Sequence, residues 1–366
     1  MQRCVRRSWH VCPHVIGAIT VAGLAPVGVL FGFAAFLIST GLYYGLPLPV
    51  QPMKAISAVI LTGGLRPGEV AAAGIMIGVV LLVLGTTGWI GRLARAIPQS
   101  VSAGLQLGLG LLMGMLGIKL ILETPWLGFG SLALLFALMR IPQCPAAPIA
   151  LAVAMMAGWV TGKVGIASAA AMTPGTPQLI MPSWAEVWRS FEIAVLPQLS
   201  LTLTNAVIVT ASLSRELFPS IGSIASERRL ALSSGIANVL LCPFGAMPMC
   251  HGAGGLAAQF RFGARTGLAP IIFGAVLLIL AIAFADHAGA MFALIPTAAV
   301  GSLLIFAGTD LAISRRLFDG KPSCLWVIGA TAFVTVTVNP ALGLILGWIA
   351  ELIRAAIVRR FIPERP

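Results

Sequence analysis

Long uninterrupted apolar runs constrain the fold of this chain more than any other feature of its sequence. Segments such as Ile75–Leu84 and Ile271–Ala285 are apolar throughout, so neither a helical nor a strand period leaves them a side for water. Only 9% of the 366 residues are charged, whereas a soluble domain carries about 25% charged residues. The composition therefore argues against a soluble enzyme, a nucleic-acid-binding protein and a disordered chain.

Lipid is the solvent that suits such a composition. A membrane-spanning helix needs about 20 mostly apolar residues, and the sequence holds about 14 apolar segments, several of them short or broken. Strands of a membrane barrel would alternate polar and apolar residues, which these segments do not do. We predict an all-α polytopic membrane protein in the lipid bilayer, with segments at 14–25, 27–46, 52–62, 69–88, 100–122, 128–140, 146–162, 193–213, 230–242, 249–260, 267–285, 296–312, 323–338 and 340–358.

The net charge of +12 does not indicate nucleic-acid binding, because the positions of the Lys and Arg residues follow the order of the apolar segments. Nearly all Lys and Arg residues lie before the first segment or in every second connection after it. The intervening connections hold only Arg66, Lys119, Lys163 and Arg189. Because cytoplasmic loops collect cations, this alternation predicts an even number of spans with both termini in the cytoplasm, as in a bacterial inner membrane.

Two sequence patterns recur in the same order in the two halves of the chain. Ile97–Gly104 is similar to Ile295–Ser302, and the Pro-Met pair at Pro52 returns at Pro248 with nearly the same offset. A repeat of about seven spans is odd-numbered, so the second copy would be inverted, which is the usual build of secondary transporters. The predicted division is a first inverted repeat over 1–162, a connection over 163–192 and a second inverted repeat over 193–366.

Two stretches would be irregular at membrane depth. Leu46–Ala55 and Pro243–Gly255 each contain prolines before a helix start, which predicts an extended segment leading into a half-helix, in spans three and ten. In lipid, such backbone is tolerated where it lines a cavity. Inversion would point the two helix N-termini towards each other, and their unpaired N–H groups would form an anion site. Its predicted residues are Gln51, Met53, Lys54, Ala55, Cys250, His251, Gly252 and Ala253.

Two side chains of this predicted site have alternative interpretations. Lys54 lies in the first turn of its half-helix, where its charge opposes the helix dipole, which is understandable if an anion lies beside it. The alternative is that the Lys54 ammonium extends to the membrane surface. His251 is either a ligand or a helper that holds its neighbours by hydrogen bonds.

Span eight is predicted to supply a third polar strip. Gln198, Thr202 and Asn205 recur at helical spacing and therefore share one face. Such a face either bonds to other helices or lines a cavity, and we favour the cavity. Gln99 and Ser100 would add further donors at the mouth of span five.

Carboxylates are missing from these strips. Asp310 and Glu351 lie near predicted cytoplasmic ends and are expected to pair with neighbouring Arg residues. A site of N–H groups, amides, hydroxyls and one Lys suits a compact oxyanion better than a cation or a nucleobase. The six cysteines show no metal-ligand spacing, and clustered Asp/His or Ser/Lys groups are also missing. We predict no metal, no cofactor and no enzyme activity.

Three motifs resemble those of the molybdate-transporter branch of the sulfate permease superfamily. They are Pro49–Ala55 (PVQPMKA), Pro197–Ala206 (PQLSLTLTNA) and Phe244–Ala257 (FGAMPMCHGAGGLA). The resemblance implies two inverted seven-span repeats arranged as core and gate domains, with the substrate among spans one, three, eight and ten.

The resemblance also implies a function. The expected activity is secondary transport of molybdate by alternating access, driven by a coupling ion, proton or sodium, in a chain that can form a homodimer. The alternatives are a sulfate or other oxyanion permease and, less favoured, a nucleobase carrier. The chain ends soon after its last span, without the soluble regulatory domain of many relatives. Residues 1–12 replace the family's Gly-Asp-Leu-Gly-Thr-like motif, so the N-terminus is atypical or truncated.

Overall fold

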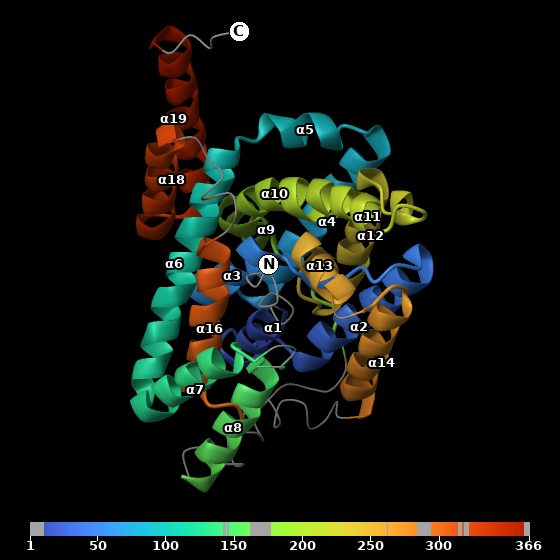
Figure 1. The fold of residues 1–366 in the computed structure, drawn as a ribbon, viewed down its shortest axis with the longest axis vertical. Coiled ribbons are helices and arrows are strands. Elements are labelled where there is room, and N and C mark those ends of the chain that lie inside the picture. Colours follow the sequence, from blue (N-terminus) through green and yellow to red (C-terminus); the bar gives the residue numbers. More distant parts are fainter. Residues whose placement is uncertain are drawn as a thin grey trace.

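The computed structural model of the chain describes residues 11–141, 144, 146–161, 177–261, 263–283, 294–313, 317 and 322–361. Within them the fold is helical, with a single pair of short strands (Figure 1). The elements are α1 (Val11–Thr20), α2 (Pro26–Tyr44), β1 (Val50–Pro52), α3 (Lys54–Gly63), α4 (Pro67–Thr87), α5 (Ile90–Ala96), α6 (Gln99–Glu123), α7 (Pro125–Leu138), α8 (Ala146–Val160), α9 (Trp184–Ser190), η3 (Phe191–Val195), α10 (Leu196–Leu201), η4 (Thr202–Val209), α11 (Thr210–Leu217), η5 (Gly222–Ile224), α12 (Glu227–Leu241), η6 (Cys242–Phe244), β2 (Met249–His251), α13 (Ala253–Arg261), α14 (Leu268–Ala283), α16 (Thr297–Ala312), η7 (Pro322–Cys324), α18 (Leu325–Thr337) and α19 (Pro340–Phe361).

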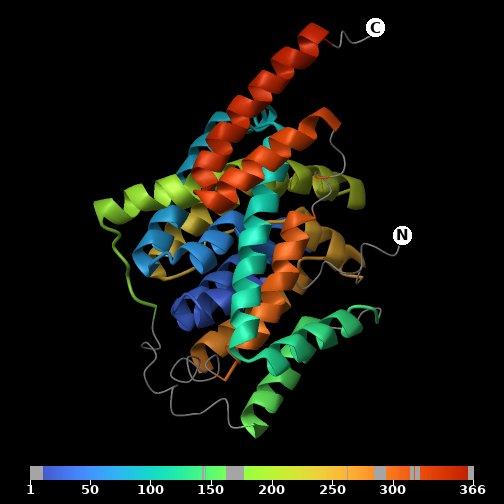
Figure 2. The same cartoon turned by 90° about the vertical axis from the view of Figure 1, so that its left-hand side faces the viewer.

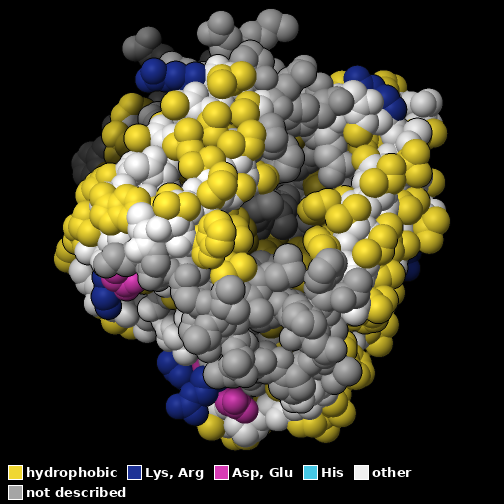
Figure 3. All heavy atoms as spheres, turned by 90° about the horizontal axis from the view of Figure 1, so that it is seen from below, with side chains coloured by type: hydrophobic (Ala, Val, Ile, Leu, Met, Phe, Trp, Pro, Cys, Tyr) yellow, Lys and Arg dark blue, Asp and Glu magenta, His cyan; other side chains and the backbone are white. Residues whose placement is uncertain are grey.

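Five helical stretches of the described chain are long and apolar enough to cross a membrane. They are Pro26–Tyr44, Pro67–Thr87, Gln99–Glu123, Trp184–Leu217 and Pro340–Val358. Shorter apolar helices of 10–17 residues lie between them, among them α3, α7, α8, α14 and α16. Hydrophobic side chains cover much of the described surface in the view from below, with a few small groups of charged residues (Figure 3). Such a surface fits a hydrocarbon environment better than water.

Proline and glycine set several helix boundaries. Pro26 and Pro67 begin α2 and α4, where the missing N–H of proline has no helical partner to lose. The same two helices end before Gly45 and Gly88, whose left-handed φ angles of 63° and 74° allow the chain to turn away.

The helices form two packed groups. In the first group, α6 packs extensively against α16 and α18, and α7, α8 and α19 join them. In the second group, α2 packs against α14 and α4 against α12, around the strand pair and α3. Figure 1 shows the first group along the left side of the molecule, and Figure 2 shows it facing the viewer. The groups meet where α1 contacts α16 and where α3 contacts α6.

The contact between α6 and α16 depends on glycine. A Cβ on Gly110 would overlap the carbonyl of Gly308, and a Cβ on Gly308 would lie 2.6 Å from the carbonyl of Gly110. Gly117 and Gly301 oppose each other in the same way, at 2.7 and 2.6 Å. Small residues therefore let the two backbones touch, as expected for helix association in lipid.

The helix that carries the polar strip Gln198–Thr202–Asn205 starts earlier than predicted. It runs from Trp184 to Leu217 rather than from 193 to 213, so the helix covers the last part of the predicted connection. The start signal is a capping box, in which Ser183 and Glu186 satisfy each other's backbone N–H groups. Pro197 cannot donate to the carbonyl four residues before it, and the turns just before it widen to the π form of η3.

Candidate functional site

The two proline-containing stretches meet as a two-stranded antiparallel sheet. Val50 pairs with His251, Gln51 with Cys250 and Pro52 with Met249. The Met53 N–H extends the pairing by donating to the Pro248 carbonyl at 2.9 Å. At both places the extended segment leads into a helix, as predicted. Each strand thus supplies the backbone partners that the other needs away from water.

The N-termini of α3 and α13 converge on this sheet. The strands run in opposite directions and each helix continues its strand, so the two helices leave the sheet in opposite directions. The positive ends of both helix dipoles and their first N–H groups therefore point back to the sheet. Neither strand nor either helix contains Asp or Glu. The geometry concentrates positive potential on β1 and β2.

Gln198 closes the N-terminus of α3. Its Oε1 accepts hydrogen bonds from the N–H groups of Ala55 at 2.8 Å and Ile56 at 3.2 Å. Its Nε2 donates to the Thr202 hydroxyl at 2.7 Å. Gln198 and Thr202 are almost fully buried, and they lie on one helical face, as the spacing predicts. The side chain of Asn205 lies outside the described residues.

Gln51 takes the corresponding place at α13. A Cβ on Gly252 would overlap the side-chain amide of Gln51, so Gly252 is the residue that leaves room for it. Gly255 likewise makes room for the ring of Pro49, which a Cβ would approach to 2.7 Å. Each half-helix start is thus covered by a glutamine: α3 by Gln198 from the long helix and α13 by Gln51 from β1.

His251 is held in a buried polar chain. Its Nδ1 lies 3.3 Å from the Pro49 carbonyl, and its Nε2 lies 2.9 Å from the Ser233 hydroxyl, which in turn contacts the Tyr44 hydroxyl at 2.8 Å. With a neutral ring, Tyr44 can donate to Ser233, Ser233 to Nε2 and Nδ1 to Pro49, and the Leu230 carbonyl, 3.2 Å from the Ser233 hydroxyl, is a second acceptor for the Ser233 proton. Phe36 packs on the ring at 5.1 Å. These contacts support the helper interpretation of His251.

Asn238 of α12 is a site-positioning residue that the sequence reasoning missed. Its Oδ1 accepts from the Met249 N–H at 2.8 Å, and its Nδ2 donates to the Met249 carbonyl at 2.7 Å. The amide therefore bonds to β2 as a neighbouring strand would. No spacing signal marks this residue, because its partner is backbone from another element.

Lys54 has a partner that the sequence did not predict. Its ammonium lies 3.8 Å from the carboxylate of Asp310 in α16, and the two side chains are 36% and 17% exposed. Asp310 is expected from the sequence to pair with a neighbouring Arg, and the nearest ones, Arg315 and Arg316, lie outside the described residues. The companion prediction for Glu351 is confirmed, since Arg354 pairs with it.

Ser100 is engaged elsewhere. Its hydroxyl donates to Glu351 of α19 at 2.7 Å, and Gln99, next to it at the start of α6, is exposed. The described contacts therefore join the start of α6 to α19 and do not bring these two residues to the strand pair.

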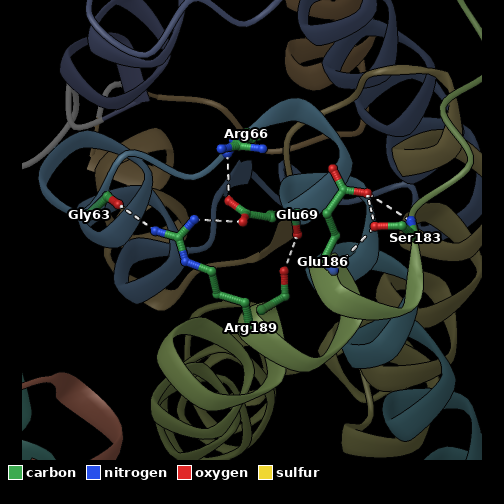
Figure 4. Close-up of polar contacts among 7 residues, drawn as sticks. Gly63, Arg66, Glu69, Ser183, Glu186 and Arg189 are labelled. Carbon is green, nitrogen blue, oxygen red and sulfur yellow. Dashed lines mark hydrogen bonds and ion pairs between the residues drawn. The ribbon is translucent and has the colours of Figure 1, made fainter.

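The long helix also holds the far end of α3 (Figure 4). Arg189 donates to the buried carboxylate of Glu69 at 2.7 Å and to the carbonyl of Gly63, the last residue of α3, at 3.4 Å. The other Glu69 oxygen accepts from the Arg66 N–H at 2.7 Å, and the Ser190 hydroxyl donates to the Glu69 carbonyl. Gln198 and Arg189 thus attach both ends of α3 to one helix.

The described part of the chain contains no cluster of three or more His, Cys, Asp or Glu side chains that could hold a metal ion. The donors of the site are N–H groups, two amides, hydroxyls and the Lys54 ammonium, and the Asp310 carboxylate lies 3.8 Å from that ammonium. Such donors bind oxygen atoms of an anion.

Comparison with known proteins gives consistent matches. Residues 10–113 and 191–311 match a family model described as molybdate transporter of the MFS superfamily. Molybdate transporter 2 of Arabidopsis thaliana is 30% identical over 392 residues, which covers 93% of this chain and 84% of the plant protein. A putative sulfate transporter of Bacillus subtilis is 24% identical over 343 residues, 89% of this chain and 70% of that protein.

The fold has solved counterparts. The transmembrane domain of a cyanobacterial bicarbonate transporter superposes with a TM-score of 0.61 at 15% identity, over 94% of this chain and 97% of that domain. At this identity the likeness concerns the fold alone, which is that of a helical membrane transporter.

Proposed function

Because this chain belongs to the molybdate transporter family, we propose that it carries molybdate across the membrane by alternating access. The family and its relatives are membrane transporters rather than enzymes, and the chain is an integral multi-pass anion transporter. One observation carries the molybdate assignment to this site: two helix N-termini converge on one strand pair that contains no carboxylate. A tetrahedral dianion is the kind of ligand that such a pair of positive helix ends stabilises.

The proposed site uses backbone and side chains together. The N–H groups near Met53–Ala55 and His251–Ala253 bind oxygen atoms of the ligand, Lys54 offsets its charge, and Gln51, Gln198, Thr202 and Asn205 select its shape. Gln198 now occupies the N–H groups of Ala55 and Ile56. An oxyanion that uses those donors must therefore displace the Gln198 amide oxygen. We propose that this oxygen occupies the position that a ligand oxygen would take.

We further propose an inverted repeat with a core and a gate. In such a repeat, span two (α2) corresponds to span nine (α12), and span four (α4) corresponds to span eleven (α14). The packed pair α2/α14 then corresponds to the pair α12/α4, which is also packed. Gly110 and Gly308 follow the two recurring patterns at the same distance, 13 positions after Ile97 and Ile295, and touch each other across α6 and α16. The first helix group would be the gate and the second the core, and their relative movement would alternate access to the strand pair.

Topology follows from the cations. Their alternation along the sequence supports cytoplasmic termini in a bacterial inner membrane. A proton or sodium ion would drive uptake, and the exposed apolar faces suit lipid and a homodimer. These parts of the proposal rest on the sequence pattern.

A second candidate substrate is sulfate. The match to a putative sulfate transporter favours it, since sulfate is also a tetrahedral dianion. A nucleobase is less favoured because β1 and β2 contain no Asp or Glu to accept from its N–H groups, and the nearby Asp310 carboxylate is paired with Lys54.

Uptake into proteoliposomes tests the proposal. Labelled molybdate is added with and without a pH gradient or a sodium gradient, and unlabelled tungstate, sulfate and uracil compete. The expected result is saturable molybdate uptake that tungstate inhibits most and uracil does not inhibit. Uptake no faster than in empty liposomes under every gradient would contradict the proposed function.

A further inference from the structure

The ion pair between Lys54 and Asp310 joins the two helix groups. Lys54 is the first residue of α3, in the group that holds the strand pair, and Asp310 is in α16 of the other group. Helix α6 packs against both α3 and α16 and brings them together (Figure 1). The Asp310 carboxylate thus reaches Lys54, next to the strand pair, from the other helix group.

The geometry of this pair suits exchange of partners. The nitrogen–oxygen distance of 3.8 Å is beyond hydrogen-bond length, and the Lys54 side chain is 36% exposed. The pair is therefore an ion contact that is not locked by a short hydrogen bond. An anion at the start of α3 would draw the same ammonium towards itself.

We infer that Asp310 is a specificity-determining residue, which competes with the oxyanion for Lys54 and so limits how strongly the site prefers dianions to monoanions. The inference rests on the proposed function for the location of the anion. Two helix N-termini and Lys54 together would hold a dianion tightly, and the Asp310 carboxylate offsets one positive charge. When the anion leaves, Asp310 takes Lys54 back, which favours release.

Tungstate and perrhenate test the inference directly. Both are tetrahedral oxyanions, but tungstate carries two negative charges and perrhenate one. Their dissociation constants are measured by calorimetry on the purified full-length protein in detergent, which does not require transport. The wild type is compared with Asp310→Asn and Asp310→Thr, which remove the charge, and with Asp310→Glu, which keeps it. Asn preserves the shape for the other interactions that Asp310 makes.

The expected change depends on ligand charge. Removing the Asp310 charge should lower the dissociation constant of tungstate about tenfold and that of perrhenate about threefold, because the electrostatic energy scales with ligand charge. Asp310→Glu should keep the wild-type ratio. Molybdate uptake by the neutral variants should show a lower half-saturating concentration and a lower maximal rate, since the anion leaves more slowly.

Two controls separate this role from a structural one. Glu123→Gln removes a carboxylate from α6 that accepts a bond from Thr297, and it should leave the tungstate-to-perrhenate ratio unchanged. In a Lys54→Gln background, Asp310→Asn should change the ratio less than in the wild type, because Lys54 is the shared partner.

Several results would overturn the inference: equal shifts for both ions, weaker tungstate binding in the neutral variants, or an undiminished shift in the Lys54→Gln background. If the wild type binds both ions with the expected pattern but transports no molybdate, the proposed function fails and the inference stands. A wild type that binds neither ion overturns both.

Discussion

The Gln198 side-chain oxygen accepts a hydrogen bond from the Ala55 N–H at 2.8 Å, so a side chain of the long helix closes the first turn of α3. The same oxygen also takes the Ile56 N–H. These are the donors that a helix start offers to an anion. The Gln198 amide that accepts from these N–H groups is neutral, and substitution by Glu would put a charged carboxylate in the same position.

Gln198→Glu should abolish oxyanion uptake. The carboxylate would keep the N–H groups of Ala55 and Ile56 and repel a dianion, so uptake should fall more than about tenfold. The measurement is initial uptake in proteoliposomes, normalised to inserted protein. Gln198→Met keeps the size without the charge and should retain more uptake than Gln198→Glu. Equal activity of the two variants would contradict the assigned position.

Gly252→Ala should impair uptake, whereas Gly254→Ala should not. A methyl group on Gly252 overlaps the Gln51 amide, whereas one on Gly254 has no atom within 4 Å. Displacing Gln51 from the start of α13 should lower uptake about fivefold or more. Both variants make the same chemical change two residues apart, so comparable loss in both would contradict the role assigned to Gln51.

Lys54→Ala should weaken uptake while the amount of inserted protein stays unchanged. The ammonium is the one fixed cation found beside the strand pair among the described residues, and it is partly exposed. The half-saturating concentration of molybdate should rise about tenfold or more, because a dianion loses its counter-charge. Uptake like that of the wild type would show that Lys54 does not contribute to the substrate site.

Asn238→Leu should destabilise the protein. It leaves the N–H and carbonyl of Met249 without their described side-chain partner in a buried place. Each unsatisfied group costs about 1–3 kcal/mol. Thermal unfolding in detergent should show a clear loss of stability, and an unfolding temperature like that of the wild type would contradict the role of Asn238.

Gly110→Val should also destabilise, by separating α6 from α16. The added side chain would overlap Gly308, and overpacking of this kind costs about 1–3 kcal/mol. Gly114, one turn further along α6, has no atom within 4 Å of an added Cβ. Gly114→Val is therefore the matched control and should unfold near the wild-type temperature. Equal losses in the two variants would show that the glycine contact between α6 and α16 is not responsible.

The sequence predicted the local backbone of the site well. Prolines at Pro49, Pro52 and Pro248 cannot continue a helix, so the extended segments and the helix starts after them follow from residue type alone. The spacing of Gln198 and Thr202 likewise places both on one face without tertiary information. The family assignment, carried by the same motifs, is confirmed by the match over both halves of the chain.

Partner choice was not predictable in the same way. The bonds of Gln198 to α3, of Asn238 to Met249 and of Lys54 to Asp310 each join residues of different elements. Composition and periodicity report which side of a helix is polar, but they do not report which helix faces that side. The widened turns at Thr202–Val209 were also missed, because π geometry has no residue signature comparable to proline.

The pairing of β1 with β2 has a consequence for how the chain is made. The backbone of Val50–Pro52 pairs with that of Met249–His251, which the ribosome adds roughly two hundred residues later. Until then, that strand lacks its partners, and unpaired backbone groups are costly in lipid. Neither half of the chain can therefore pair its own strand, and the first half can reach its final fold after the second half has been synthesised.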